Sequence, residues 1–213
     1  MSFLPTLLGA VCVAVMIVSD ARGAASGRAA AKALASLCFV SQVVMNGASG
    51  NLAERAVTLG LALSLMGDLF LISREKRMFL AGLGAFLLAH VAYIVAFGTL
   101  GVHWPATGIA LLALGAGTGA LASRFVPKAG SLAPAVIGYI VVITVMGALA
   151  IGGAYATPTL ARVVLALAAV AFMASDVCVA RDRFEHGGFA NRASGWALYY
   201  SAQFAFAWAI GSA

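Results

Sequence analysis

Residues 63–98 read LSLMGDLFLISREKRMFLAGLGAFLLAHVAYIVAFG, two apolar runs joined by a short charged segment. A helix needs about 20 mostly apolar residues to cross the hydrocarbon core of a bilayer, and both runs belong to stretches of that length. One carboxylate, Asp68, interrupts the first run. An ionisable side chain at the centre of a span costs roughly 3 kcal/mol on insertion scales, so Asp68 requires an explanation.

The rest of the chain has the same apolar character. Of its 213 residues, 63% are hydrophobic and 9% are charged, whereas soluble domains carry about 25% charged residues. Mean hydropathy is +1.03. We therefore expect an all-α, polytopic integral membrane protein that forms a single helical domain over residues 1–213. About eight transmembrane helices are predicted, near residues 3–19, 29–47, 54–72, 78–98, 104–122, 131–151, 158–180 and 192–211.

The first predicted span, MSFLPTLLGAVCVAVMIVSDARGA, also resembles a secretory signal that ends in a small-residue cleavage site. A signal normally begins with a positively charged region. The first basic residue here is Arg22, after the apolar run. This order favours a retained first helix.

The net charge of +6 is concentrated in alternate connections between the predicted spans. Arg55 and Arg162 fall on one side, and eleven basic residues fall on the other: Arg22, Arg28, Lys32, Arg74, Lys76, Arg77, Arg124, Lys128, Arg181, Arg183 and Arg192. The positive-inside rule then predicts cytoplasmic odd-numbered connections and both termini outside, as in a protein of a bacterial inner (plasma) membrane. The charge reports topology and contact with membrane lipids, so no nucleic-acid partner is expected.

Asp68 and Asp176 are the acids that lie well inside predicted spans. At 1.5 Å per residue, each lies about 7–8 Å from a cytoplasmic charge cluster. They belong to similar segments, SLMGDLFLISREKRMF and AFMASDVCVARDRFEH, in helices predicted to run the same way. A similarity of this kind arises either from duplication of a four-helix unit or by chance.

Other polar side chains in the predicted spans recur at helical spacing. His90 has Tyr93 one turn further on along the same face, and Lys32 begins the second span with Ser36 one turn deeper. The last span carries a polar stripe in WALYYSAQF, made by Trp196, Tyr199 or Tyr200, and Gln203.

Each candidate also has a purely structural interpretation. An Asp near a helix end can pair with a loop Arg or Lys, and a buried His can be a hydrogen-bonded packing residue. Tyrosines form interfacial belts, and Lys32 can snorkel to the membrane surface. Two matched carboxylates favour chemistry, because both should point into the bundle rather than to lipid. We expect both to face a common polar cavity in the cytoplasmic half of the bundle, near Tyr199 or Tyr200. Repulsion and desolvation there would keep one carboxyl group protonated, giving a proton donor and a proton acceptor.

A metal site is the competing use of these side chains. Zinc hydrolases usually present three protein ligands, often with two or more histidines. His103 and His186 are predicted in connections at opposite membrane faces, which leaves His90 without a histidine partner. We expect neither a metal nor another cofactor.

Several segments resemble the YhhN family. They are GLALSLMGDLFLI, FLAGLGAFLLAHVAYIVAF, FMASDVCVARDRF and LYYSAQF, and the resemblance follows nearly the whole chain in order. Lys32 also resembles a lysine near the start of the family's second span, although the proline that often follows it there is Ala33 here. The family includes lysoplasmalogenases, membrane enzymes that hydrolyse the vinyl ether bond of lysoplasmalogens.

The resemblance implies a lysophospholipid substrate and a catalytic group formed by Asp68, Asp176 and His90. The expected substrate-binding residues are Lys32, which would hold the phosphate, and Tyr93, Tyr199, Tyr200 and Gln203. Acid catalysis fits a vinyl ether, because protonation of its β-carbon gives an oxocarbenium ion of the kind that glycosidases stabilise with two carboxylates. The products would be a fatty aldehyde and a glycerophospho-alcohol. An Asp68→Asn variant should then be at least as stable as the parent, with activity reduced at least about a hundredfold.

One distance argues against this arrangement. Counted from Arg77, His90 lies about 20 Å into the membrane, well below the expected depth of both carboxylates. The alternatives to a hydrolase are a small proton-coupled transporter, in which Asp and His would form a proton path, and a lipid-binding membrane protein. The oligomeric state and the lipid headgroup are left open.

Overall fold

The structure is a computed structural model that describes residues 3–47, 50–73 and 75–213. It confirms the all-helical fold, and each of the eight α-helices in these residues overlaps one predicted span. The helices are α1 (Leu4–Ala21), α2 (Ala25–Met45), α3 (Leu52–Phe70), α4 (Lys76–Thr99), α5 (Trp104–Ala129), α6 (Ala133–Ala156), α7 (Leu160–Glu185) and α8 (Gly188–Ala209).

Length and hydropathy identify the chain as an integral membrane protein. Within the described residues, five helical stretches are long and apolar enough to cross a bilayer, and one of them, Trp104–Ala156, contains both α5 and α6. The other four are α1, α2, α4 and α7. Helices α3 and α8 are not among these five stretches, and both contribute to the candidate site described below.

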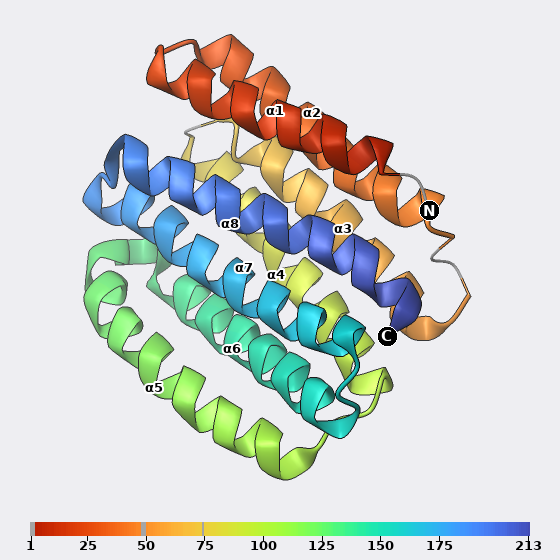
Figure 1. Ribbon diagram of the computed structural model, residues 1–213. Coiled ribbons are helices and arrows are strands. Elements are labelled where there is room, and N and C mark those ends of the chain that lie inside the picture. Colours follow the sequence, from red (N-terminus) through yellow and green to blue (C-terminus); the bar gives the residue numbers. More distant parts are fainter. Residues whose placement is uncertain (1–2, 48–49, 74) are drawn as a thin grey trace.

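The helices run alternately in opposite directions and pack as four hairpins, α1–α2, α3–α4, α5–α6 and α7–α8 (Figure 1). The α1–α2 hairpin lies at one side of the bundle and the α5–α6 hairpin at the other, with α3, α4, α7 and α8 between them. The connections after α1, α3, α5 and α7 lie together at one end of the molecule. The two termini lie at the opposite end.

The helices at the charged end continue beyond the predicted spans. We expected the fifth and seventh spans to end near residues 122 and 180, whereas α5 continues to Ala129 and α7 to Glu185. Arg124 donates two hydrogen bonds to Glu185, of 2.8 and 2.7 Å, and Lys128, one turn further along α5, pairs with the same carboxylate. These interactions hold helical turns outside the apolar core, where hydropathy gives no signal.

A second ion cluster joins the first hairpin to the last at the same end. Asp20, with a side chain 1% exposed, pairs with Arg28 of α2 and Arg192 of α8, each at 2.7 Å. Of the eleven basic residues predicted on this side, Arg74 lies outside the described residues. The structure therefore gathers the described basic connections at one end, and their orientation in the membrane stays a prediction.

Two glycines of α3 lie against aromatic rings of α4. A Cβ atom added at Gly67 would lie 2.6 Å from the Phe86 ring, and one at Gly60 would overlap the Tyr93 ring. Small residues allow such close approach between membrane helices. Because Gly60 and Gly67 have no side chains, the Tyr93 and Phe86 rings of α4 can pack directly against α3.

Candidate active site

The carboxylate of Asp68 lies near the C-terminal end of α3 and is 2% exposed. Its Oδ1 atom is 3.0 Å from the Lys32 ammonium group. Its Oδ2 atom accepts hydrogen bonds from Ser36 at 2.6 Å and from Tyr199 at 2.7 Å. One cation and two hydroxyl donors therefore satisfy both oxygens.

A third hydroxyl, that of Tyr200, supports this arrangement through Ser36 and the backbone of Lys32. Tyr200 of α8 lies 3.1 Å from the Ser36 hydroxyl and donates to the Lys32 carbonyl oxygen, also at 3.1 Å. Tyr199 and Tyr200 are both buried, so they are not belt residues at the membrane surface. Lys32 lies two turns inside α2 rather than at its start, and its side chain is 14% exposed.

The Lys32–Asp68 ion pair changes the expected effect of removing the Asp68 charge. The sequence predicted that relief of repulsion with Asp176 would leave an Asp68→Asn variant at least as stable as the parent. Removal of one partner from a buried ion pair leaves the other charge uncompensated, which is strongly destabilising. That stability prediction is therefore corrected here.

Asp176 of α7 has a different environment. Its Oδ2 atom accepts a 2.7 Å hydrogen bond from Tyr139 of α6 and lies 4.0 Å from Nε2 of His90. In the described part of the chain, no Lys or Arg forms an ion pair with Asp176. Asp176, with a side chain 19% exposed, therefore has one hydroxyl donor and a nearby imidazole, whereas Asp68 has a cation and two hydroxyl donors.

His90 occupies an aromatic cage beside Asp176. It is fully buried, and neither ring nitrogen has a hydrogen-bond partner among the described residues. Its ring centroid lies 4.7 Å from that of Phe172 and 5.2 Å from that of Tyr139. A buried polar group without a partner is uncommon in native proteins, and this one points to a role that a packing residue would not need.

The structure resolves the difficulty over the depth of His90. Because α7 continues to Glu185, Asp176 lies nine residues, or about 14 Å, from the C-terminal end of its helix. Asp68 lies two residues from the end of α3. The two carboxylates therefore lie at different distances from the ends of their helices, and Nε2 of His90 lies 4.0 Å from Oδ2 of Asp176.

A third polar group lies between α3, α4 and α8. Tyr93 donates a 2.9 Å hydrogen bond to Oε1 of Gln203, and its hydroxyl is 3.5 Å from that of Ser64. Both Tyr93 and Gln203 are fully buried. Ser64 and Gln203 lie one turn from Asp68 and Tyr199 respectively, so this group adjoins the Asp68 cluster on the side of the membrane centre.

Aromatic rings separate the two carboxylate clusters. The Tyr199 ring, which carries the hydroxyl bound to Asp68, packs on Phe172 at 5.3 Å and on Phe86 at 5.8 Å. Phe172 in turn contacts His90. All the predicted site residues thus lie in one continuous region of the bundle.

Sequence reasoning missed Tyr139 and did not assign a role to Ser36 or Ser64. A tyrosine in the predicted span 131–151 was a detectable signal, because it is the one hydroxyl-bearing aromatic residue in that stretch. Ser64 lies one helical turn before Asp68 and was detectable by the same spacing that paired His90 with Tyr93. Nothing in the sequence indicated which helix would face Asp176.

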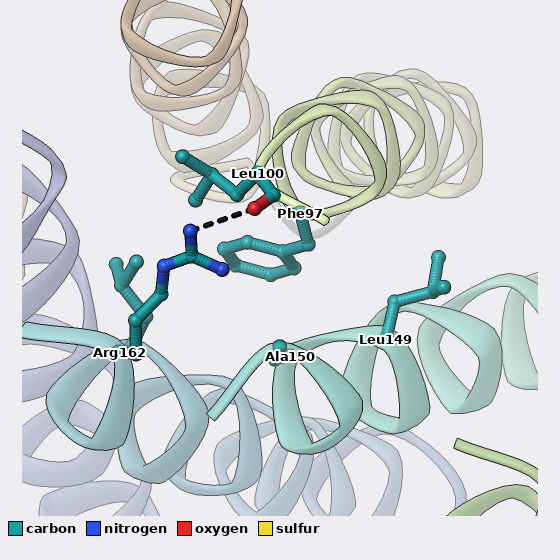
Figure 2. Close-up of a pocket in the computed structure, with 7 residues that line it drawn as sticks. Phe97, Leu100, Leu149, Ala150 and Arg162 are labelled. Atoms are coloured by element: carbon teal, nitrogen blue, oxygen red, sulfur yellow. Dashed lines mark hydrogen bonds between the residues drawn. The ribbon is translucent and has the colours of Figure 1, made fainter. Parts of the chain in front are cut away.

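Two hollows in the structure lie away from this region. One follows α1 from Val11 to Ala24 on the outer surface. The other, of about 10 Å³, adjoins Phe97 and Arg162 near the opposite end of the bundle, and that volume is close to the minimum for one water molecule. Figure 2 shows Arg162 reaching from α7 to the Leu100 carbonyl, a 2.6 Å hydrogen bond beside the Phe97 ring. A common cavity at Asp68 and Asp176 stays a prediction.

No group of three or more His, Cys, Asp or Glu side chains suited to a metal ion occurs within residues 3–47, 50–73 and 75–213. The fold and the buried polar region together define an integral membrane helical bundle with two carboxylates held by tyrosines. The sequence model of the YhhN family matches residues 27–210, and the chain belongs to this family. No curated protein and no solved structure matches the chain.

Proposed function

We propose that this protein is a membrane-embedded hydrolase that cleaves the vinyl ether bond of lysoplasmalogen-type lysophospholipids by acid–base catalysis with Asp68 and Asp176. Membership of the YhhN family supports the choice of substrate class. The observation that carries the proposal is the contrast between the two carboxylates. Asp68 has a cation and two hydroxyl donors, whereas Asp176 has one hydroxyl donor and an adjacent buried histidine.

This contrast assigns the two catalytic roles. Asp176 is the acid, since a carboxyl group in an apolar site without a cation retains its proton. Asp68 is the ionised partner. Pairs of titratable groups whose environments separate their protonation states supply the donor and the acceptor in acid–base catalysis.

The reaction begins with proton transfer from Asp176 to the β-carbon of the vinyl ether. The carbon–carbon double bond supplies the electron pair, and the positive charge is shared between the α-carbon and the ether oxygen. The Asp68 carboxylate stabilises this oxocarbenium ion, as carboxylates do in glycosidases. Water adds to the α-carbon as the Asp68 carboxylate takes its proton. The resulting hemiacetal then breaks its bond to the glycerol oxygen, which receives the proton from Asp68 while the hemiacetal hydroxyl gives its proton to the Asp176 carboxylate, so both acids return to their starting states. One water is consumed, and a fatty aldehyde and a glycerophospho-alcohol are released.

His90 and Lys32 have supporting roles in this proposal. His90 is neutral in its aromatic cage, and its Nε2 atom, 4.0 Å from Asp176, is suitably placed to hold a water molecule against that carboxyl group. Lys32 has three N–H donors, so it can keep Asp68 as a partner while another donor binds the phosphate of the lysolipid.

A transporter has less support from the fold. Transporter sites of this kind often lie between helices that are broken near the bilayer midplane. The described helices run without a mid-span break, and the internal Pro127 of α5 lies two residues before the end of that helix.

The test is aldehyde release from a lysoplasmalogen by the purified protein in detergent. Wild-type protein should release aldehyde, and Asp176→Asn should reduce the rate by at least about a hundredfold, as loss of a general acid does. Asp182→Asn is the matched control, because Asp182 lies on the same helix but is 40% exposed and contacts Arg192 at 3.4 Å. Equal rates for Asp176→Asn and wild type would refute the proposed mechanism, and no aldehyde from wild type would refute the activity.

A further inference from the structure

The amide group of Gln203 is only half satisfied. Its Oε1 atom accepts the hydrogen bond from Tyr93, which fixes the orientation of the side chain. Its Nε2 atom is buried and has no hydrogen-bond partner among the described residues. A buried amide nitrogen without an acceptor loses its hydration without compensation, so Nε2 of Gln203 is a donor that a bound ligand could satisfy.

This position borders the proposed site. Gln203 lies one turn after Tyr199 on the same face of α8, and the Tyr199 hydroxyl donates to Asp68. Tyr93, which holds the other end of the amide, is one turn from His90 and in edge contact with its ring, with centroids 6.4 Å apart. The unpaired atom is therefore placed between the Asp68 cluster and the His90 cage.

We propose that Gln203 recognises the free hydroxyl group on C2 of the substrate's glycerol and so determines which ether lipids the site accepts. This inference rests on the proposed function, since it takes the substrate class from there. C2 is bonded to C1, which carries the vinyl ether oxygen. A group that holds the C2 hydroxyl therefore also places the ether next to the two carboxylates.

A hydroxyl group suits this position on chemical grounds. Its oxygen accepts hydrogen bonds, so it can accept one from the Nε2 group of Gln203 while Tyr93 holds Oε1. A ligand with hydrogen in place of the hydroxyl would leave the amide unpaired. Sites built to bind a hydroxyl group discriminate strongly against analogues that lack it, for this reason.

The experiment measures binding of a saturated ether lysolipid, which has no vinyl ether to cleave, and of its 2-deoxy analogue. Native mass spectrometry of the full chain in detergent gives both dissociation constants. Wild-type protein should bind the hydroxyl-bearing lipid about tenfold or more tightly. In Gln203→Met, which keeps the side-chain length but has no amide, the two lipids should bind equally.

Gln42→Met is the matched control. Gln42 is also a fully buried glutamine, but it lies on α2 with Thr6 at 2.7 Å and Asn46 at 3.1 Å as partners, outside the site. This variant should keep the wild-type preference. Gln203→Leu provides a second substitution if Gln203→Met does not fold.

Equal binding of the two lipids to wild-type protein would overturn the inference without reference to any variant. An unchanged preference in a folded Gln203 variant would do the same, because the hydroxyl would then be recognised elsewhere and water would satisfy the amide. The proposed function fails separately, through absence of aldehyde release from a vinyl ether lysolipid. A lost preference in Gln203→Met together with no aldehyde would retain the recognition site and discard the hydrolysis.

Discussion

At the scale of single residues, the partners of the two carboxylates explain how acids are tolerated inside an apolar bundle. Charged groups in a membrane interior pair with one another or face a polar cavity. Asp68 meets this requirement through Lys32, Ser36 and Tyr199, and Asp176 through Tyr139. Asp68 has a cationic partner, whereas Asp176 has a neutral hydroxyl partner. Substitutions can therefore separate the contribution of each residue to stability from its contribution to activity.

The Asp68→Asn variant should lose both stability and activity. Lys32 would remain largely buried without its partner, and Tm should fall by about 5–10 °C, somewhat less than loss of a fully buried pair would cause. Aldehyde release should fall at least about a hundredfold. The double variant Asp68→Asn, Lys32→Met removes the stranded charge, so Tm should recover most of its value while activity stays absent. A double variant with restored activity would return Asp68 to a purely structural role.

Substitution of Tyr139 by Phe tests the positioning of Asp176. The change removes the hydroxyl that donates to Oδ2 and keeps the ring beside His90. We expect the fold to be retained and kcat to fall about tenfold, the effect of losing one hydrogen bond of about 1.4 kcal/mol. Tyr155→Phe on the same helix is the control, since Tyr155 is 70% exposed. An unchanged kcat and pH profile in Tyr139→Phe would contradict a positioning role.

At the scale of elements, the glycines of α3 determine how α4 presents its aromatic residues. Gly60 lies against the Tyr93 ring and Gly67 against the Phe86 ring. Tyr93 holds Gln203, and Phe86 packs on Tyr199. The position of α4 relative to α3 is therefore transmitted directly to the side chains around the carboxylates.

A methyl group at Gly60 should disturb this contact. Gly60→Ala forces the Tyr93 ring to move, and overpacking of this kind typically costs about 1–3 kcal/mol. Thermal unfolding in detergent should show the loss of stability, together with weaker binding of the saturated ether lysolipid. Gly84→Ala on α4 is the control, because nothing lies within 4 Å of a Cβ atom added there. Equal losses in both variants would indicate a general effect of helix glycines.

At the scale of the whole molecule, most of the basic residues lie at one end of the bundle. The ion clusters around Asp20 and Glu185 lie at this end and tie α1, α2, α5, α7 and α8 together. Lys32 reaches the same end from the Asp68 cluster. A lysolipid with its phosphate at this surface would place its chain along the bundle axis, beside the buried polar region.

Reporter fusions test the orientation of the bundle. The eleven basic residues on one side predict that this end faces the cytoplasm. A reporter active only in the cytoplasm should therefore be silent when fused after Ala213 and active when inserted at Gly130, in the connection between α5 and α6. The reverse pattern would invert the protein and place the candidate site toward the outer half of the membrane.

The sequence by itself determined the fold class and the approximate helix positions. Both depend on local properties, because a helix that crosses hydrocarbon must satisfy its own backbone and present apolar side chains over a fixed length. It also indicated Asp68, Asp176, His90 and the polar stripe of α8, since buried polar residues stand out against an apolar background. The helix ends around Ala129 and Glu185 were underestimated because ion pairs, not hydropathy, extend them.

The tertiary structure decided which of these side chains meet. No periodicity relates Lys32 to Asp68, or Tyr139 to Asp176, because each pair joins helices whose relative rotation and depth depend on packing along their whole length. The glycines of α3 allow the Tyr93 and Phe86 rings of α4 to pack against that helix. The packing of α6 against both α4 and α7 places Asp176 beside His90 and Tyr139. The distinction between an ion-paired Asp68 and an unpaired Asp176 follows from these contacts, and hence from long-range packing that local sequence does not encode.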